Sequence, residues 1–320
     1  MRQLLLFGFV FFLAVLFAFC KKKTNKDGWE DTLQAGTIRI AGDESFKNMV
    51  DAAIVSFEAY SDYAATIFPI YSNEDEAIRL LTEDSVRLVV VSRDLDGKEQ
   101  EKMHERRMVA RKHLIAFEGI AFITNPTNRD SLIGLPTVKK ILSGEITEWS
   151  QIYPKSPLGT IRVIFDSKQS SVLRHVADSI MKGEALSPNL YGSKNIDELI
   201  EKINELPNSL GVVGFNQIND VMQRKPLDVQ GKFRMLRIGK EESATLQNTY
   251  LPYAGDLLSD GYPFWRPVYV LISDPRMGLS SGFSVFLANH TGQRVISKSG
   301  LLPAIMDTGK LSVNVVDGQF

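Results

Sequence analysis

From residue 36 onward, hydrophobic and polar positions follow two alternating periods. Residues 37–41 alternate one by one, as in a strand, whereas residues 46–60 carry apolar side chains at helical spacing. Residues 86–91 are almost continuously apolar, which is typical of a strand buried on both faces. The regular exchange of these patterns predicts an α/β fold with largely parallel sheets. Further strands are expected at 64–71, 114–123 (interrupted at 118–119), 161–165, 211–215, 233–238 and 267–273, and further helices at 74–81, 98–107, 138–143, 171–182, 196–206 and 282–299.

The N-terminal end departs from this pattern. Residues 4–19 form an uncharged apolar run that is shorter than the roughly 18 to 20 residues a membrane-spanning helix needs. We therefore predict a signal peptide over residues 1–19, ending just before Cys20, the only cysteine. Cys20 is either a thiol in an uncleaved anchor or the acylated first residue of a lipoprotein, and the pattern favours the second. Residues 20–35 are mostly polar and charged, and predict a lipidated tether.

Length, charge and residue spacing narrow the function classes. A chain of 320 residues favours two folding units. Its 37 basic and 38 acidic residues are well mixed, without a basic stripe, so we expect no nucleic-acid partner. The four histidines lie far apart in the sequence, and no phosphate-binding loop or dinucleotide fingerprint is present. We therefore expect no metal and no cofactor.

Four polar turns follow expected strands, at 42–45, 71–76, 92–96 and 166–171. In open α/β sheets, ligands bind beyond the carboxyl ends of the strands, where hydroxyl groups can meet an anion. Serine is also a favoured helix cap, and for any one turn taken alone capping is the better interpretation. The arginine of the third turn can bind an oxyanion or pair with a nearby carboxylate. The candidate side chains are Ser45, Ser72, Ser92, Arg93, Ser170 and Ser171.

Signals for catalysis are weak. Residues 278–282 match G-x-S-x-G around Ser280, but residues 274–277 separate them from the preceding expected strand, so no strand-to-helix elbow is expected. We interpret the match as an ordinary loop and helix cap. We expect a protein that is not an enzyme, with a serine hydrolase acting through Ser280 as the weakest alternative.

Four segments carry a family resemblance. Residues 141–152 (ILSGEITEWSQI) are similar to a family segment SGEIT-x-W, and residues 211–215 (GVVGF) to a strand G-x-I-G-Y. Residues 261–267 (GYPFWRP) are similar to YP-x-x-R-P, and residues 292–303 to a C-terminal helix and turn. In this order, and over residues 37 to 305, the chain resembles the phosphate-binding proteins of bacterial ABC transporters.

The resemblance implies a type II periplasmic-binding-protein fold, in which two α/β lobes close over a ligand. It implies lobe 1 at residues 36–116 and 232–320, and lobe 2 at residues 117–231. It also implies that the polar turns face one cleft. By position, the implied ligand contacts are Ser45, Phe46, Ser72, Arg93, Ser170 and Ser171.

Departures from the family pattern concern charge. The second turn carries the acidic residues Glu74, Asp75 and Glu76, which repel a phosphate dianion unless they face solvent. The family's aspartate matches Arg93, and its arginine matches Asp166. We therefore hypothesise that the two charges have exchanged lobes and form an ion pair across the cleft.

The resemblance favours an extracytoplasmic solute-binding protein in the periplasm or on the cell surface. It implies that the protein captures phosphate or a related small oxyanion and presents it to an ABC transporter permease by hinge closure, as a monomer held at the membrane by its lipid anchor. The alternative is a sensor or interaction module on the same fold that binds no phosphate. The acidic second turn and Val172, which replaces a hydroxyl donor, favour this alternative.

Overall fold

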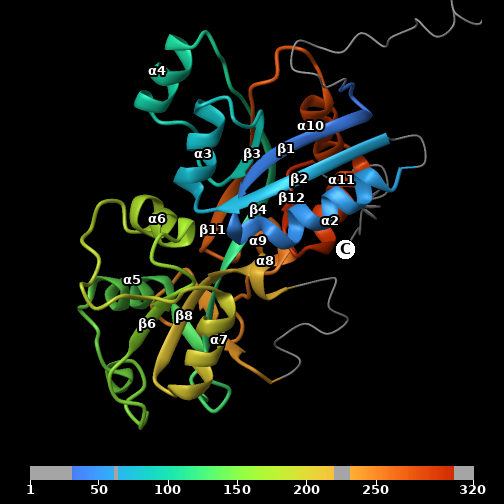
Figure 1. Cartoon of the computed structure of the whole chain (residues 1–320). Coiled ribbons are helices and arrows are strands. Elements are labelled where there is room, and N and C mark those ends of the chain that lie inside the picture. The colour runs from blue at the N-terminus through green and yellow to red at the C-terminus, as the bar shows by residue number, and fades with distance from the viewer. Residues whose placement is uncertain (1–30, 61–63, 220–230, 306–320) are drawn as a thin grey trace, which may run out of the picture.

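The computed structural model describes residues 31–60, 64–219 and 231–305. They form two α/β lobes, and strand β4 (Arg111–Thr124) runs from one lobe into the other (Figure 1). The strand order is β2-β1-β3-β11-β4-β8-β6-β7, with β9 and β12 also paired to β4. The predicted two-lobed α/β architecture is confirmed.

Lobe 1 is built on a mixed sheet with helices on both faces. β1, β2 and β3 are parallel, and β11 is antiparallel to β3 and β4. One face packs on α2, α10 and α11, and the other on α3 (Figure 1). The bounds are β1 (Ala35–Asp43), η1 (Glu44–Phe46), α2 (Lys47–Glu58), β2 (Ala64–Ser72), α3 (Glu74–Thr82), β3 (Leu88–Val91), α4 (Gly97–Glu105), β11 (Trp265–Ile272), α10 (Leu279–Ala288), α11 (His290–Lys298) and β12 (Leu302–Pro303).

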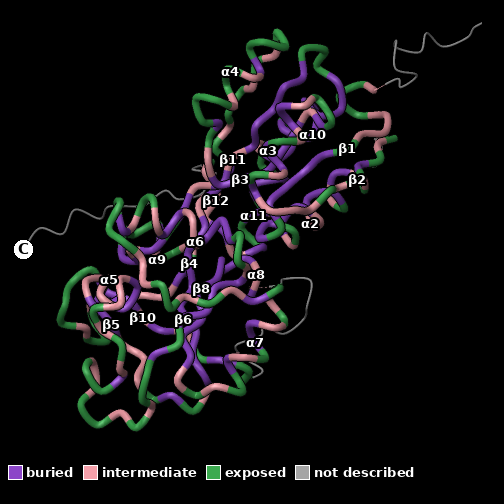
Figure 2. Tube along the Cα trace, turned by 60° about the vertical axis from the view of Figure 1, so that its left-hand side comes forward, coloured by how far each residue is buried: buried purple, intermediate pink, exposed green. Residues whose placement is uncertain are grey.

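Lobe 2 is built around the second half of β4. β8 is antiparallel to β4, and β6 and β7 continue the sheet in parallel, with a separate pair formed by β5 and β10. Figure 2 shows that each lobe has its own buried interior. The bounds are β5 (Leu132–Gly134), α5 (Leu135–Ser143), η2 (Trp149–Gln151), β6 (Arg162–Phe165), α6 (Ser171–His175), η3 (Val176–Ile180), β7 (Tyr191–Gly192), α7 (Ile196–Glu205), β8 (Ser209–Gly214), α8 (Phe215–Ile218), β9 (Arg234–Met235), β10 (Arg237–Gly239) and α9 (Ala254–Leu258).

The crossing between the lobes corrects two predictions. β4 is one continuous strand of 14 residues, so the interruption expected at 118–119 is wrong. Instead the strand changes partners there: it pairs with β11 up to Gly119 and with β8 from Ile120. The second correction concerns residues 233–264, which were assigned to lobe 1. Their buried side chains, Tyr262 and Phe264 among them, pack in the cores of lobe 2, so the chain returns to lobe 1 only at β11.

Two expected helices also differ from the prediction. The helix that begins at Ser171 is α-helical for only five residues and continues as the π-helical turn η3. The expected helix over 282–299 is two helices, α10 and α11, separated at Asn289, whose side chain caps the second. Ser280 lies buried in the first turn of α10 rather than in a loop.

Candidate functional site

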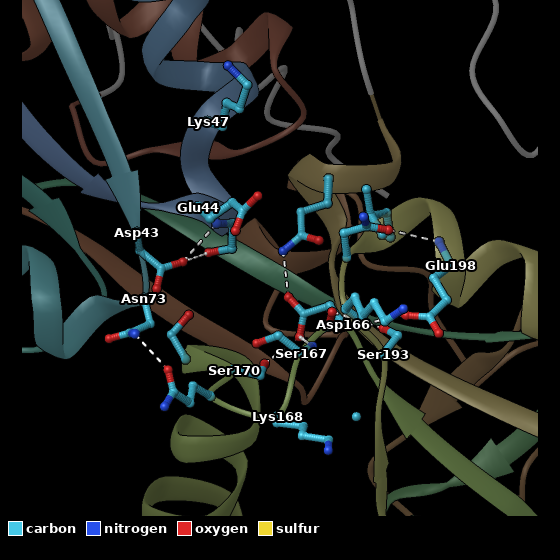
Figure 3. Close-up of a pocket in the computed structure, with 18 of the residues that line it drawn as sticks. Asp43, Glu44, Lys47, Asn73, Asp166, Ser167, Lys168, Ser170, Ser193 and Glu198 are labelled. Carbon is cyan, nitrogen blue, oxygen red and sulfur yellow. Dashed lines mark hydrogen bonds between the residues drawn. The ribbon is translucent and has the colours of Figure 1, made fainter.

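A polar cleft of about 830 Å³ lies between the lobes. Lobe 1 lines it with the turns after β1 and β2, and lobe 2 lines it with the turn after β6 and the start of α7. Figure 3 shows Asp43 and Glu44 on one side and Asp166, Ser170 and Ser193 on the other. The turns come together because parallel strands end at the same edge of a sheet, which is where ligands of such folds bind.

Four of the predicted serines line this cleft: Ser45, Ser72, Ser170 and Ser171. The hydroxyl hydrogens of two of them are committed to carboxylates. Ser45 Oγ donates to Asp43 Oδ1, and Ser170 Oγ donates to Asp166 Oδ1. Ser170 is also the N-cap of α6, because its Oγ accepts a hydrogen bond of 3.1 Å from the Leu173 amide. Ser170 thus both caps α6 and lines the cleft.

A buried ion pair that the sequence interpretation missed lies behind two serines at the floor of the cleft, Ser45 and Ser171. Arg266 on β11 and Glu118 on β4 lie directly opposite each other in the antiparallel ladder, and both are 0% exposed. Arg266 Nε and Nη2 each lie 2.7 Å from Glu118 Oε2. The signal in the sequence is a single charged residue within or beside each of two apolar strands.

Arg266 also bridges the two lobes. Its Nη2 donates to Ser45 Oγ of lobe 1 and its Nη1 donates to Ser171 Oγ of lobe 2, both at 2.7 Å. Phe46, another predicted contact, does not line the cleft. It is fully buried, and the centre of its ring lies 4.6 Å from the Arg266 guanidinium carbon.

Burial shifts the pKa values of the titratable side chains around Arg266. Burial raises the pKa of Asp43 to about 6, although the positive charge of Arg266 opposes the shift. Burial likewise raises the pKa of Glu118, with Arg266 again opposing. His175 has its pKa lowered to about 4, by burial first and then by Arg266. Its Nε2 therefore donates to the Trp265 carbonyl, 3.0 Å away, as a neutral imidazole.

Comparison with known proteins places the chain in a family. A model of the PBP superfamily domain matches residues 30–290. The chain belongs to the PBP superfamily. It is 21% identical to the phosphate-binding protein PstS of Borreliella burgdorferi, covering 94% of this chain and 99% of the relative. To PstS of Bacillus subtilis it is 22% identical, covering 88% and 86%.

Solved structures of other proteins share the fold. A substrate-binding protein from Clostridium perfringens, solved with bound phosphate, superposes with a TM-score of 0.66 at 20% identity, over 84% of this chain and 100% of that one. An ABC-type phosphate transport receptor from Vibrio cholerae gives 0.61 at 16% identity, over 83% and 99%. These identities support the fold alone, which is the two-lobed PBP fold predicted from the sequence.

Two predicted contacts of the PBP cleft lie outside it. Ser92 and Arg93 line a separate cavity beside Arg174. Arg93 is held by carboxylates of its own lobe, with Nη2 2.8 Å from Asp75 Oδ1 and Nη1 2.7 Å from Glu99 Oε2. The turn after β3 directs this arginine away from the cleft, because its partners lie on α3 and α4.

The hypothesis of an ion pair between Arg93 and Asp166 is therefore wrong. Asp166 is instead satisfied within lobe 2. It accepts hydrogen bonds from Ser170 Oγ and from Gln217 Nε2, the latter at 2.7 Å. The charges thus do not form the cross-cleft pair that the exchange was expected to produce.

A different ion pair joins the lobes. Arg174 of α6 places Nη2 at 2.6 Å and Nε at 2.8 Å from Glu74 Oε2, and it also donates to Ser92 Oγ at 3.0 Å. Asn73 Nδ2 donates to Gln169 Oε1 of lobe 2 at 2.7 Å. The acidic second turn is thereby partly neutralised, since Glu74 is paired with Arg174 and the largely exposed Asp75 with Arg93.

Within residues 31–60, 64–219 and 231–305, no helix combines the length and apolar character needed to cross a bilayer. The same residues contain no cluster of three or more His, Cys, Asp or Glu side chains placed to hold a metal ion. Cys20 and the predicted signal peptide lie outside the described residues.

Proposed function

We propose that this protein is an extracytoplasmic solute-binding protein that captures phosphate or a related oxyanion for an ABC importer. One observation carries the proposal: Ser45 of lobe 1 and Ser171 of lobe 2 converge on one buried guanidinium in the floor of the cleft. The relatives named for phosphate binding support the choice of ligand.

Binding is coupled to hinge closure. A ligand that contacts both lobes has more interactions in the closed state than in the open state, so it shifts the population toward closure. The closed shape is then the signal that a permease recognises. Selectivity follows from the buried donors, because an ill-fitting ligand leaves them without partners.

The N-terminal segment would hold the protein at the membrane. We propose that Cys20 is acylated after removal of residues 1–19 and that the binding domain acts as a monomer without catalytic activity. Metabolic labelling with a fatty acid tests the anchor. Label that disappears in Cys20→Ala supports it, and label that persists in this variant contradicts it.

Calorimetric titration of the full chain in detergent with phosphate, sulfate and phosphonate tests the ligand. We expect binding of phosphate at a Kd on the order of micromolar or tighter, with Ser171→Ala weakening it about tenfold through loss of one hydrogen bond. Ser284→Ala is the matched control, because Ser284 is a buried serine that contacts His113 in lobe 1, outside the cleft. Absence of heat with all three anions would instead support a sensor or interaction module.

A further inference from the structure

Four lysines, Lys47, Lys168, Lys194 and Lys202, carry the positive charge along the rim of the cleft. Lys47 is paired with Asp51 at 2.6 Å and Lys202 with Glu198 at 3.1 Å, whereas the side chains of Lys168 and Lys194 are exposed to solvent. Deeper in the cleft, the carboxylates of Asp43 and Asp166 line its wall. Exposed lysines are screened by solvent, so an anion held between the buried serines is better matched by a cation fixed beside them.

Arg266 is placed to supply that charge. The guanidinium is a planar fork with five N–H donors, and here the two Nη groups point to opposite lobes, one to Ser45 and one to Ser171. The Glu118 carboxylate holds the other edge, and the Phe46 ring lies close to the guanidinium. The fork is thus oriented before any ligand arrives, which reduces the entropy lost on binding.

The two contacts with serine explain how a fully buried arginine can be reached. Ser45 and Ser171 belong to different lobes, and both line the cleft. Because these hydroxyls cover the two Nη groups from opposite lobes, opening of the lobes would separate them and uncover the Nη edge of Arg266.

The two serines differ in what they can offer an anion. The Ser45 hydroxyl hydrogen is donated to Asp43. Among the hydrogen bonds of the described residues, Ser171 Oγ appears only as an acceptor from Arg266, so its hydrogen is available to a ligand. A ligand oxygen near Ser171 can therefore receive hydrogen bonds from both Ser171 and Arg266.

We propose that Arg266 is the anion-coordinating residue of the cleft, with Glu118 as the positioning residue that aims its Nη edge at the ligand. The proposal rests on the function proposed above and places the counter-charge of the ligand on strand β11 rather than in the polar turns. The other oxygen of Glu118, Oε1, accepts a hydrogen bond of 3.0 Å from the backbone amide of Asn216, which fixes the orientation of the carboxylate. The ligand class is accordingly a small oxyanion that accepts a bidentate guanidinium.

A double variant separates ligand coordination from folding. Arg266→Gln alone leaves Glu118 buried without a counter-charge, which is strongly destabilising. Arg266→Gln combined with Glu118→Gln removes both charges and retains hydrogen-bonding side chains at both positions. The matched control is Arg79→Gln with Glu76→Gln, which removes an ion pair within lobe 1 and leaves Arg266 and Glu118 in place.

The full chain and both double variants are titrated with phosphate after their unfolding midpoints have been measured. We expect the Arg266/Glu118 variant to bind at least about 100-fold more weakly, through loss of two charge-assisted hydrogen bonds, and the control to remain within about fivefold of wild type. A folded Arg266/Glu118 variant that binds within fivefold of wild type overturns the assignment and leaves the proposed function standing. A wild-type protein that binds no oxyanion overturns both.

A readout on the wild type keeps the test independent of variant folding. With ¹⁵N-labelled arginine side chains, the Arg266 resonances are assigned by their proximity to the Phe46 ring. We expect phosphate to shift the Nη resonances of Arg266 and to leave those of the surface residue Arg79 in place. Arg266 resonances that do not move at saturating phosphate overturn the proposal.

Discussion

Arg174 is the residue whose replacement tests lobe closure most directly. It lies on α6 of lobe 2 and makes its shortest contact, 2.6 Å, with Glu74 of lobe 1. Its side chain is 28% exposed and that of Glu74 only 3%. Since this contact exists only while the lobes are closed, Arg174→Gln is expected to shift the population toward the open state.

The size of the shift depends on the hydrogen bonds that Glu74 retains when Arg174 is replaced. A buried hydrogen bond to a charged group contributes about 1.5 to 3 kcal/mol. Without Arg174, Glu74 still accepts from the amide and hydroxyl of Ser92, and Arg93 Nε lies 3.9 Å away. We therefore expect a loss of about 1.5 to 2 kcal/mol in the free energy of closure, or roughly a 10- to 30-fold change in the open-to-closed ratio.

Pulsed EPR measures this ratio as a distance distribution between the lobes. Spin labels are attached to cysteines introduced at the exposed positions Glu101 and Lys155, in a Cys20→Ser background. Arg79→Gln is the control, because Arg79 pairs only with glutamates of lobe 1. If Arg174→Gln and Arg79→Gln give the same distribution, the ion pair does not hold the lobes together and the reasoning fails.

Three further predictions concern stability. Because burial raises the pKa of Asp43 from 3.8 to about 6, this group favours the folded state below pH 3.8 and loses that contribution as the pH rises through 6. In urea unfolding, Asp43→Asn should therefore be more stable than wild type by about 2 to 3 kcal/mol near neutral pH. Near pH 3.5 the two proteins should have the same free energy of unfolding. An equal difference at both pH values would contradict the buried-charge explanation. Trp149→Ala should cost about 3 to 5 kcal/mol, since Trp149 is 0% exposed, whereas Trp265→Ala, at 41% exposed, should cost far less. Gly119→Ala would place a Cβ 2.6 Å from a neighbouring proline and should cost about 1 to 3 kcal/mol, while Gly97→Ala meets nothing within 4 Å and should be nearly neutral.

Local patterns predicted the elements well because the information for them is local. The helix expected at 98–107 begins within one residue of that position, at Gly97, where the side chains of Asp96 and Glu99 form a capping box. The return of the chain to lobe 1 was placed too early because residues 233–264 contain short apolar segments that suit either core. Their assignment depends on which sheet is nearby, and periodicity does not report this.

The sequence by itself determined that polar turns follow the strands and that serines stand at their ends, since side-chain period and turn chemistry are properties of neighbouring residues. Only the tertiary structure decided which charges meet. Arg93, which sequence position placed in the cleft, pairs within its own lobe, whereas Arg266 reaches Glu118 across 148 positions and Ser45 across 221. Ion pairs depend on distance in space, and the antiparallel pairing of β4 with β11 sets that distance here. The residue proposed to bind an anion in the cleft therefore lies on strand β11 rather than in the turns that first suggested the site.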